Sequence, residues 1–265
     1  MTNFVWESDQ TVTINNIKFT LADGSPQSAQ FQPTEDHFLL CKPRIYVERY
    51  DDFFKKYAKK KIIEIGVFKG GGLVFYDQVC HPEKIVAIEY NPKPIEGLTR
   101  YIQVNHKSDS VKVYYGTNQS DPVVMRQILA NEFPNRDVDF VVDDASHRYF
   151  ETKASFNFVF PYLKAGAHYI IEDWGWAHWS GRWQDPPHRL SRWKWWANKP
   201  PKGCLSLTNF LVELCMLSAS RPDIIQNIFV DCGVIVVKRG NADLPLDFDI
   251  SNYYLMRGKK FKPFL

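Results

Sequence analysis

The sequence predicts an α/β protein with a mostly parallel sheet and helices on both faces. Short apolar runs rich in Val and Ile alternate with longer amphipathic segments, a pattern typical of βαβ units. The chain of 265 residues, with 45% hydrophobic and 15% aromatic residues, is also long enough to bury the core of one large domain.

The first 43 residues are expected to form an N-terminal extension of this domain, which itself spans residues 44–265. The extension contains one alternating segment, "TVTINNIKFTL" (11–21), which is typical of a strand or hairpin. A stretch rich in turn-forming residues follows it at 22–36.

From residue 44 onward, long amphipathic segments and short apolar runs follow one another. The long segments are 44–60, 73–80, 121–133, 149–163 and 205–220. The short runs, expected as strands, are 61–67, 84–90, 111–116, 138–146 and 167–173. Two further strand-like pieces, 225–231 and 233–240, are expected to pair as a hairpin at a sheet edge.

Composition bounds the functional class. The 33 basic and 30 acidic residues are mostly interspersed, so no basic surface for nucleic acid is expected. The five cysteines form no CxxC pair and no zinc spacing, which favours a reducing cytoplasm. No stretch has the apolar length of a membrane span, and the N-terminus lacks the features of a signal peptide. We therefore expect a cytoplasmic protein without a membrane partner.

The most informative stretch is "IIEIGVFKGGG" (62–72). A dinucleotide fingerprint needs a second glycine two residues after the first, and Phe68 stands at that position after Gly66. This disfavours close contact with a diphosphate. Glu64, at the end of the strand, offers a carboxylate that can attract a cationic ligand such as the amino group of S-adenosylmethionine.

A second carboxylate supports a nucleoside ligand. Glu89 ends the next strand-like run, 23 residues after Gly66, where an acid is placed to accept hydrogen bonds from ribose hydroxyls. The alternative is that Glu64 and Glu89 are ordinary strand-end carboxylates without a ligand.

Several motifs together resemble a known family. In chain order they are "EIGVFKGGG", "AIEYNP", "YYGTNQSD", "VVDDASH" and "YIIEDW". They are similar to the motifs of class I, metal-dependent S-adenosylmethionine O-methyltransferases, and most of all to those that methylate sugar hydroxyls of macrolides, whose relatives include proteins labelled cephalosporin hydroxylase. The resemblance covers about residues 60–240. It implies a Rossmann-like sheet with an antiparallel C-terminal strand, and S-adenosylmethionine and Mg²⁺, or another divalent cation, as cofactors.

The resemblance also implies a set of cofactor-binding residues. Glu64, Gly66 and Gly70 would line the methionine and ribose side, and Glu89 would hold the ribose. Residues 118–120 would border the adenine. The full expected set is Glu64, Gly66, Lys69, Gly70, Glu89, Asn118, Gln119, Ser120, Asp143 and Asp144.

By the same resemblance, Asp143, Glu172 and Asp173 match positions that bind the divalent cation. Such carboxylates at strand ends suit Mg²⁺, which prefers hard oxygen ligands. Consecutive strand residues point to opposite faces, so Glu172 and Asp173 can share a metal only if the strand ends or bulges there. The alternative is that Asp144 or Asp173 caps a following helix.

The catalytic candidates are His147, His178 and Asp143, with His188 behind them. His147 can equally be a structural histidine or one that contacts adenine, and His178 can be an ordinary exposed loop histidine. His178 and His188 lie in an insert, residues 174–203, that holds most of the chain's eight tryptophans. Aromatic side chains suit stacking on sugars, but they can also bury a subunit contact in a homo-oligomer.

These features predict a Mg²⁺-assisted methyl transfer from S-adenosylmethionine to a hydroxyl of a small molecule, expected to be a sugar of a natural product. Two alternatives stay open. One is methylation of a phenolic or catechol hydroxyl, and the other is a non-catalytic accessory protein that binds a nucleoside.

Overall fold

The computed structural model describes residues 3–22, 28, 30–57, 60–178 and 205–264. The chain forms two compact units. The first comprises Met1–Asn118 and Val138–Phe140, and the second comprises Gln119–Asp137 and Val141–Leu265. In the described part of the chain, no helix has the length and apolar character that a membrane span requires.

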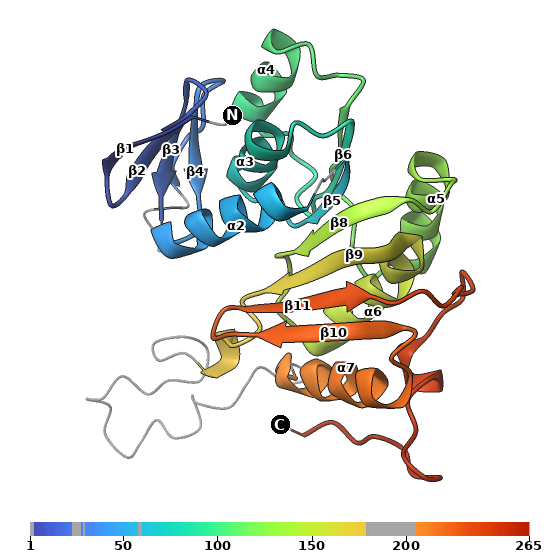
Figure 1. The fold of residues 1–265 in the computed structure, drawn as a ribbon. Coiled ribbons are helices and arrows are strands. Elements are labelled where there is room, and N and C mark those ends of the chain that lie inside the picture. Colours follow the sequence, from blue (N-terminus) through green and yellow to red (C-terminus); the bar gives the residue numbers. More distant parts are fainter. Residues whose placement is uncertain (1–2, 23–27, 29, 58–59, 179–204, 265) are drawn as a thin grey trace, which may run out of the picture. The chain divides into compact units, whose positions relative to one another are not determined.

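A small sheet opens the first unit (Figure 1). Its strands, in the order β1-β2-β3-β4, are β1 (Phe4–Ser8), β2 (Thr11–Ile14), β3 (Ile17–Leu21) and β4 (His37–Leu40). β2 and β3 form an antiparallel hairpin. Asn15 and Asn16 make its turn with φ values of 47° and 72°, the left-handed conformation that tight hairpin turns need and that Asn tolerates.

Among its described residues, the first unit also contains strands of a larger sheet, including the start of β8 (Val138–Asp143), and helices. Its other strands of this sheet are β5 (Lys61–Ile65), β6 (Lys84–Ile88) and β7 (Val111–Tyr114), and they are parallel. The helices are α2 (Arg44–Lys56), α3 (Gly71–Cys80) and α4 (Glu96–Val104).

Aromatic packing forms the core of this unit. Helix α2 buries Val47, Tyr50 and Phe54, which recur at the spacing of one helix face. The ring of Tyr50 lies 6.3 Å from that of Phe75 in α3, and the ring of Phe54 lies 5.1 Å from that of Phe140, edge to face. Burial of these rings holds α2 and α3 against the strands that carry the glycine-rich turn.

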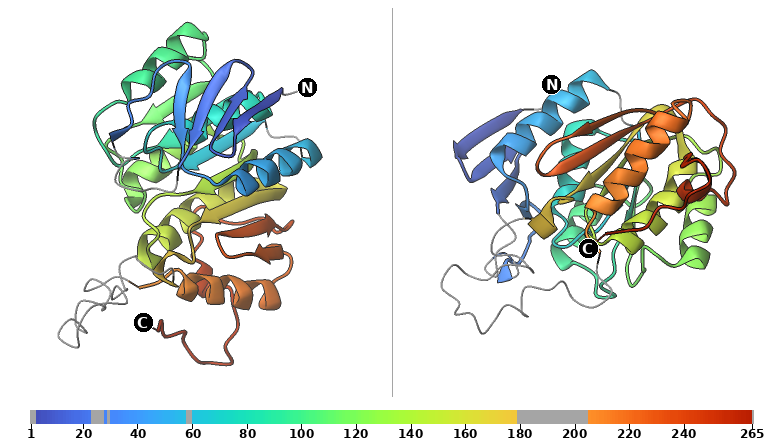
Figure 2. Two further views of the ribbon diagram at one scale, coloured as in Figure 1. Left: turned by 90° about the vertical axis from the view of Figure 1, so that its left-hand side faces the viewer. Right: turned by 90° about the horizontal axis from the view of Figure 1, so that it is seen from below.

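The second unit contains the remaining elements. Its helices are α5 (Pro122–Glu132), α6 (Tyr149–Val159) and α7 (Thr208–Ser220), with the 3₁₀ turns η1 (Phe160–Tyr162), η2 (Trp176–His178) and η4 (Ile250–Asn252). Its strands are β9 (Leu163–Glu172), β10 (Ile225–Val230), β11 (Val234–Arg239) and the end of β8 (Val138–Asp143). Figures 1 and 2 show α7 alongside β10.

Phe156 of α6 is the centre of the second core. Its ring stacks on Phe160 at 4.4 Å and meets Tyr169 of β9 at 5.1 Å and Phe210 of α7 at 5.2 Å. All four side chains are fully buried. The two helices and β9 therefore share one packed interior.

The large sheet has seven strands in the order β10-β11-β9-β8-β5-β6-β7. Parallel pairing joins β5, β6 and β7, whereas β9, β11 and β10 pair antiparallel at the other end. This confirms the predicted α/β class, the mostly parallel sheet flanked by helices and the antiparallel hairpin at the C-terminal edge.

Candidate functional site

The glycine-rich turn after β5 depends on glycine backbone geometry. Gly66 has a φ of 91° and donates its N–H to the carbonyl of Ile88 at 2.9 Å. Gly70, with a φ of 84°, stands directly before α3. Both φ values are costly for residues with a Cβ atom. The two predicted cofactor glycines thus shape the turn between β5 and α3.

Glu89 ties this turn to the loop after β6. One carboxylate oxygen accepts the N–H groups of Val67 at 2.9 Å and Phe68 at 3.0 Å, and the other accepts that of Asn91 at 2.7 Å. A carboxylate offers about four acceptor positions, so capacity for a ligand hydroxyl remains. The sequence predicted Glu89 as a ribose acceptor; its contacts add a role in holding both loops.

Glu64 lies beneath the first turn of α3. Its side chain is buried, and a Cβ atom added to Gly72 would lie 2.2 Å from its Oε1. Only a glycine at position 72 leaves room for the carboxylate in this position. Lys69 is half-buried, with its Nζ 5.8 Å from the centre of the Phe68 ring.

A cavity opens beside the turn within the first unit. It has a volume of about 420 Å³, and its lining includes Phe68 and Lys69 from the turn and Asn91 and Lys93 from the loop after β6. Cavities that bind small molecules commonly have volumes of about 300–1,000 Å³. The two loops joined by Glu89 therefore border a space that is large enough for a ligand.

Asp143, at the end of β8, is a buried hydrogen-bond centre of the second unit. It accepts bonds from the hydroxyls of Ser155 at 2.6 Å and Tyr169 at 2.9 Å, and from the amide of Gln119 at 3.4 Å. Burial raises the pKa of Asp143 to about 6, although the two hydroxyl bonds oppose the rise. The amide of Gln119 also donates to Ser155 at 3.1 Å. These contacts fix the point at which the loop after β8 begins.

Asp144, His147 and Asp173 come together in the same unit. They are half-buried, and one ligand atom from each lies within 4.8 Å of the others. The Nε2 atom of His147 is 3.9 Å from an oxygen of Asp144. His147 and Asp173 have φ values of 54° and 53°. Non-glycine residues adopt this conformation uncommonly, and such outliers cluster at functional sites.

The expected metal ligands are Asp143, Glu172 and Asp173. Only Asp173 belongs to the group that the structure brings together. β9 ends at Glu172, and Asp173 lies outside the strand. The two residues can share a metal only if the strand ends or bulges at this point. Glu172 is still in register, opposite Val234 of β11, and it is buried. Among the described residues, neither Asp143 nor Glu172 joins the group of Asp144, His147 and Asp173.

The sequence predicts Asp144 as a cofactor-binding residue and His147 as a catalytic residue. The signal for the observed group is the three-residue spacing of Asp144 and His147 in "DDASH", which brings both side chains to one side of a tight loop.

The structure describes some of the other predicted residues, and the rest lie outside the described residues. His178 ends η2, with its Nε2 2.6 Å from the hydroxyl of Thr208. The His147 ring lies 6.1 Å from that of Trp176. Asn118 is exposed and Ser120 is half-buried. His188 and most of the Trp-rich insert, from residue 179 onward, lie outside the described residues.

Two carboxylates and an imidazole are a suitable donor set for a divalent cation. Carboxylate oxygens suit Mg²⁺ and Mn²⁺, and imidazole suits transition metals. With the two carboxylates as ligands, coordination positions remain for a substrate oxygen, and the imidazole of His147 lies beside them.

Comparisons with known proteins agree with the motifs. No protein-family model matches the chain. The chain is 26% identical over 145 residues to demethylmacrocin O-methyltransferase of Streptomyces fradiae, covering 51% of this chain and 33% of that protein. It is 36% identical over 63 residues to L-olivosyl-oleandolide 3-O-methyltransferase of Streptomyces antibioticus, covering 24% of this chain and 16% of that protein. The chain thus spans a third or less of the length of these curated relatives.

Solved structures share the fold. The MycE methyltransferase of the mycinamycin pathway, in complex with Mg, SAH and mycinamycin VI, superposes with a TM-score of 0.52 and 21% identity over 73% of this chain and 49% of that chain. The SAH-bound methyltransferase PaMTH1 of Podospora anserina superposes with a TM-score of 0.51 and 19% identity, covering 76% of this chain and 80% of that chain. The chain therefore has the Rossmann-like fold of methyltransferases, and the resemblance of its motifs to macrolide sugar O-methyltransferases is confirmed by similarity to two such enzymes.

Proposed function

We propose that this protein is an S-adenosylmethionine-dependent O-methyltransferase that uses a divalent cation and methylates a sugar hydroxyl of a small natural product. The observation that carries the proposal is the group formed by Asp144, His147 and Asp173. The sequence similarity to two macrolide sugar O-methyltransferases supports the reaction and the class of acceptor.

The first unit would hold the cofactor. Glu64 would attract its amino group, and the turn that begins at Gly66 would pass beneath the nucleoside. Glu89 would accept hydrogen bonds from the ribose hydroxyls through its remaining acceptor capacity. The bound cofactor supplies a methyl group on a positively charged sulfur.

The second unit would hold the cation and take up the proton. Asp144 and Asp173 are the preferred ligands of a hard cation such as Mg²⁺. A bound cation lowers the pKa of an acceptor hydroxyl and orients it. His147 is then left to accept the hydroxyl proton at Nε2 as the oxygen bonds to the methyl carbon. The electron pair of the carbon–sulfur bond would stay on sulfur, giving S-adenosylhomocysteine.

The test measures S-adenosylhomocysteine formation by the purified protein with Mg²⁺ and one acceptor at a time. A macrolide glycoside, its aglycone and a catechol are compared, each with and without a chelator. We expect product only with the glycoside, loss of product after chelation and recovery when Mg²⁺ is restored.

Each other outcome points to a different function. Turnover of the catechol alone would favour the phenolic reaction. Binding of S-adenosylhomocysteine without turnover of any acceptor would favour a nucleoside-binding accessory protein. Full activity after thorough metal removal would contradict the role assigned to Asp144 and Asp173.

A further inference from the structure

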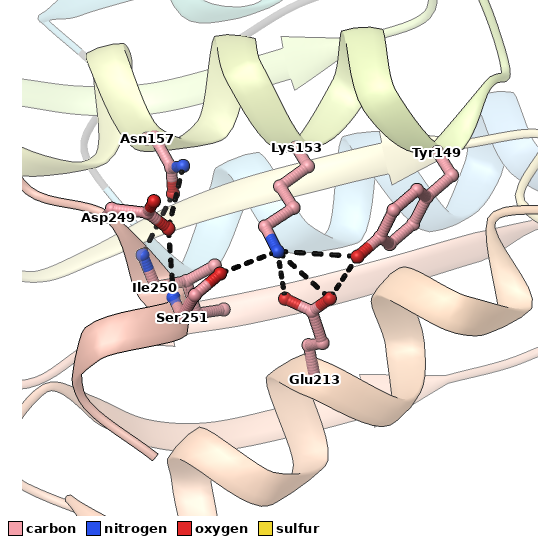
Figure 3. Close-up of polar contacts among 7 residues, drawn as sticks. All are labelled: Tyr149, Lys153, Asn157, Glu213, Asp249, Ile250 and Ser251. Carbon is pink, nitrogen blue, oxygen red and sulfur yellow. Dashed lines mark hydrogen bonds and ion pairs between the residues drawn. The ribbon is translucent and has the colours of Figure 1, made fainter. Parts of the chain in front are cut away.

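A buried ion pair joins α6 and α7 (Figure 3). The Nζ of Lys153 lies 2.6 Å from one carboxylate oxygen of Glu213 and 3.0 Å from the other. The Glu213 side chain is fully buried and that of Lys153 is 16% exposed. Lys153 also donates to the hydroxyl of Ser251 at 2.7 Å. A buried pair of this kind seldom stabilises a protein more than apolar residues would, so its presence calls for another role.

The third member of the cluster is Tyr149, the first residue of α6. Its hydroxyl donates to the Glu213 carboxylate, and its backbone N–H donates to the carbonyl of Leu205 at 3.2 Å. The side chain is 3% exposed. The residue before it, Arg148, contributes no side-chain cap to the helix. The start of α6 is therefore held by the side-chain hydroxyl and the backbone N–H of Tyr149, and not by a capping side chain.

This anchor lies just after the loop that carries Asp144 and His147, two of the three grouped residues. His147 is two residues before Tyr149, and Asp144 is three residues earlier still. At the other end of the loop, Asp143 is fixed by Ser155 and Tyr169. A loop this short cannot change the direction of its side chains freely when both of its ends are fixed.

We propose that Tyr149, held by the Glu213–Lys153 pair, is a positioning residue that keeps Asp144 and His147 facing Asp173. The inference rests on the proposed metal site. Residues that orient metal ligands from behind typically change metal affinity by about 10–100-fold when they are replaced. Tyr149 does this by fixing the backbone that follows the ligands.

The same helix provides a matched control. The amide of Asn157 donates to Asp249 at 3.3 Å and accepts the N–H of Ile250 at 3.1 Å. Figure 3 shows this contact farther along α6, beside the cluster of Tyr149, Lys153 and Glu213. Asn157 ties α6 to the C-terminal segment, but it makes no contact with Tyr149 among the hydrogen bonds of the described residues. Its loss should cost stability without releasing the loop.

The test compares Tyr149→Phe with Asn157→Ala, using Mn²⁺ as the probe and its electron paramagnetic resonance spectrum as the readout. We expect Tyr149→Phe to weaken Mn²⁺ binding about tenfold and to broaden the spectrum of the bound ion. Asn157→Ala should leave Mn²⁺ affinity within about twofold, since distant sites act independently. Affinity for S-adenosylhomocysteine should not change in either variant.

Hydrogen exchange gives a second readout that needs no metal. Without added cation, the amides of residues 144–148 should exchange faster in Tyr149→Phe than in the wild type or in Asn157→Ala. Glu213→Gln, which keeps an acceptor oxygen but loses the charge that attracts Lys153, should shift both readouts in the same direction and replaces Tyr149→Phe if that variant does not fold.

The failures are distinguishable. Unchanged Mn²⁺ affinity and unchanged loop exchange in Tyr149→Phe would overturn the positioning role and leave the proposed function intact. A wild type that binds no Mn²⁺ would overturn the metal site instead. Equal losses of Mn²⁺ affinity in Tyr149→Phe and Asn157→Ala would show a general effect of stability and would also overturn the inference.

Discussion

The Nε2 atom of His147 lies 3.9 Å from the Oδ1 atom of Asp144, and a carboxylate oxygen of Asp173 completes the group within 4.8 Å. An imidazole beside a cation-bound hydroxyl is a suitable group to accept its proton. Two carboxylates this close repel one another unless a cation or a proton neutralises them. The arrangement could thus hold a divalent cation that neutralises both carboxylates.

Asp144→Asn should weaken Mn²⁺ binding by more than about 100-fold, because it replaces a charged ligand and even outer contacts cost 10–100-fold. Asp143→Asn should weaken it only about tenfold, because Asp143 acts through its bonds to Ser155 and Tyr169. Calorimetric titration measures both, with the exposed Asp247→Asn as the control. The reverse order would restore Asp143 as the ligand, as the sequence first predicted.

Glu89→Ala should weaken S-adenosylhomocysteine binding and lower the melting temperature. The change removes the acceptor for three backbone N–H groups, so the free energy of unfolding should fall by about 1–3 kcal/mol. Calorimetry and thermal melting measure the two effects. The control, Glu83→Ala, removes only an exposed ion pair with Lys60. It should change ligand affinity and melting temperature little. Undiminished ligand binding in Glu89→Ala would contradict the ribose assignment.

Gly71→Ala should lower the free energy of unfolding by about 3 kcal/mol, although alanine favours helices. The added Cβ would lie 1.9 Å from the backbone oxygen of Leu39, so β4 and α3 would have to separate. Gly166→Ala, with no atom within 4 Å but a φ of 78°, should cost only about 1 kcal/mol. Urea unfolding compares the two variants. If Gly71→Ala lowered the free energy of unfolding less than Gly166→Ala does, the close approach of α3 to β4 would be disproved.

Strong periodic patterns predicted most of the fold. The helices α2, α5, α6 and α7 and the buried strands β5, β6, β8 and β9 lie where long amphipathic segments and apolar runs placed them. Among the described elements, β1, β4 and α4 were missed. β4 has only four residues, and α4 has nine, too few for hydrophobic periodicity to stand out.

The sequence by itself determined the chemistry available to this protein: a glycine-rich turn between two strand-end carboxylates, and aspartates and histidines after two further strands. Only the tertiary structure decided which of those side chains meet. Among the described residues, Asp144, His147 and Asp173 form the close group and Asp143 and Glu172 lie outside it; His147 and Asp173 both have a left-handed backbone conformation. Backbone direction at the end of a strand depends on contacts from distant segments, such as those of Ser155 and Glu213, so no local pattern predicts it.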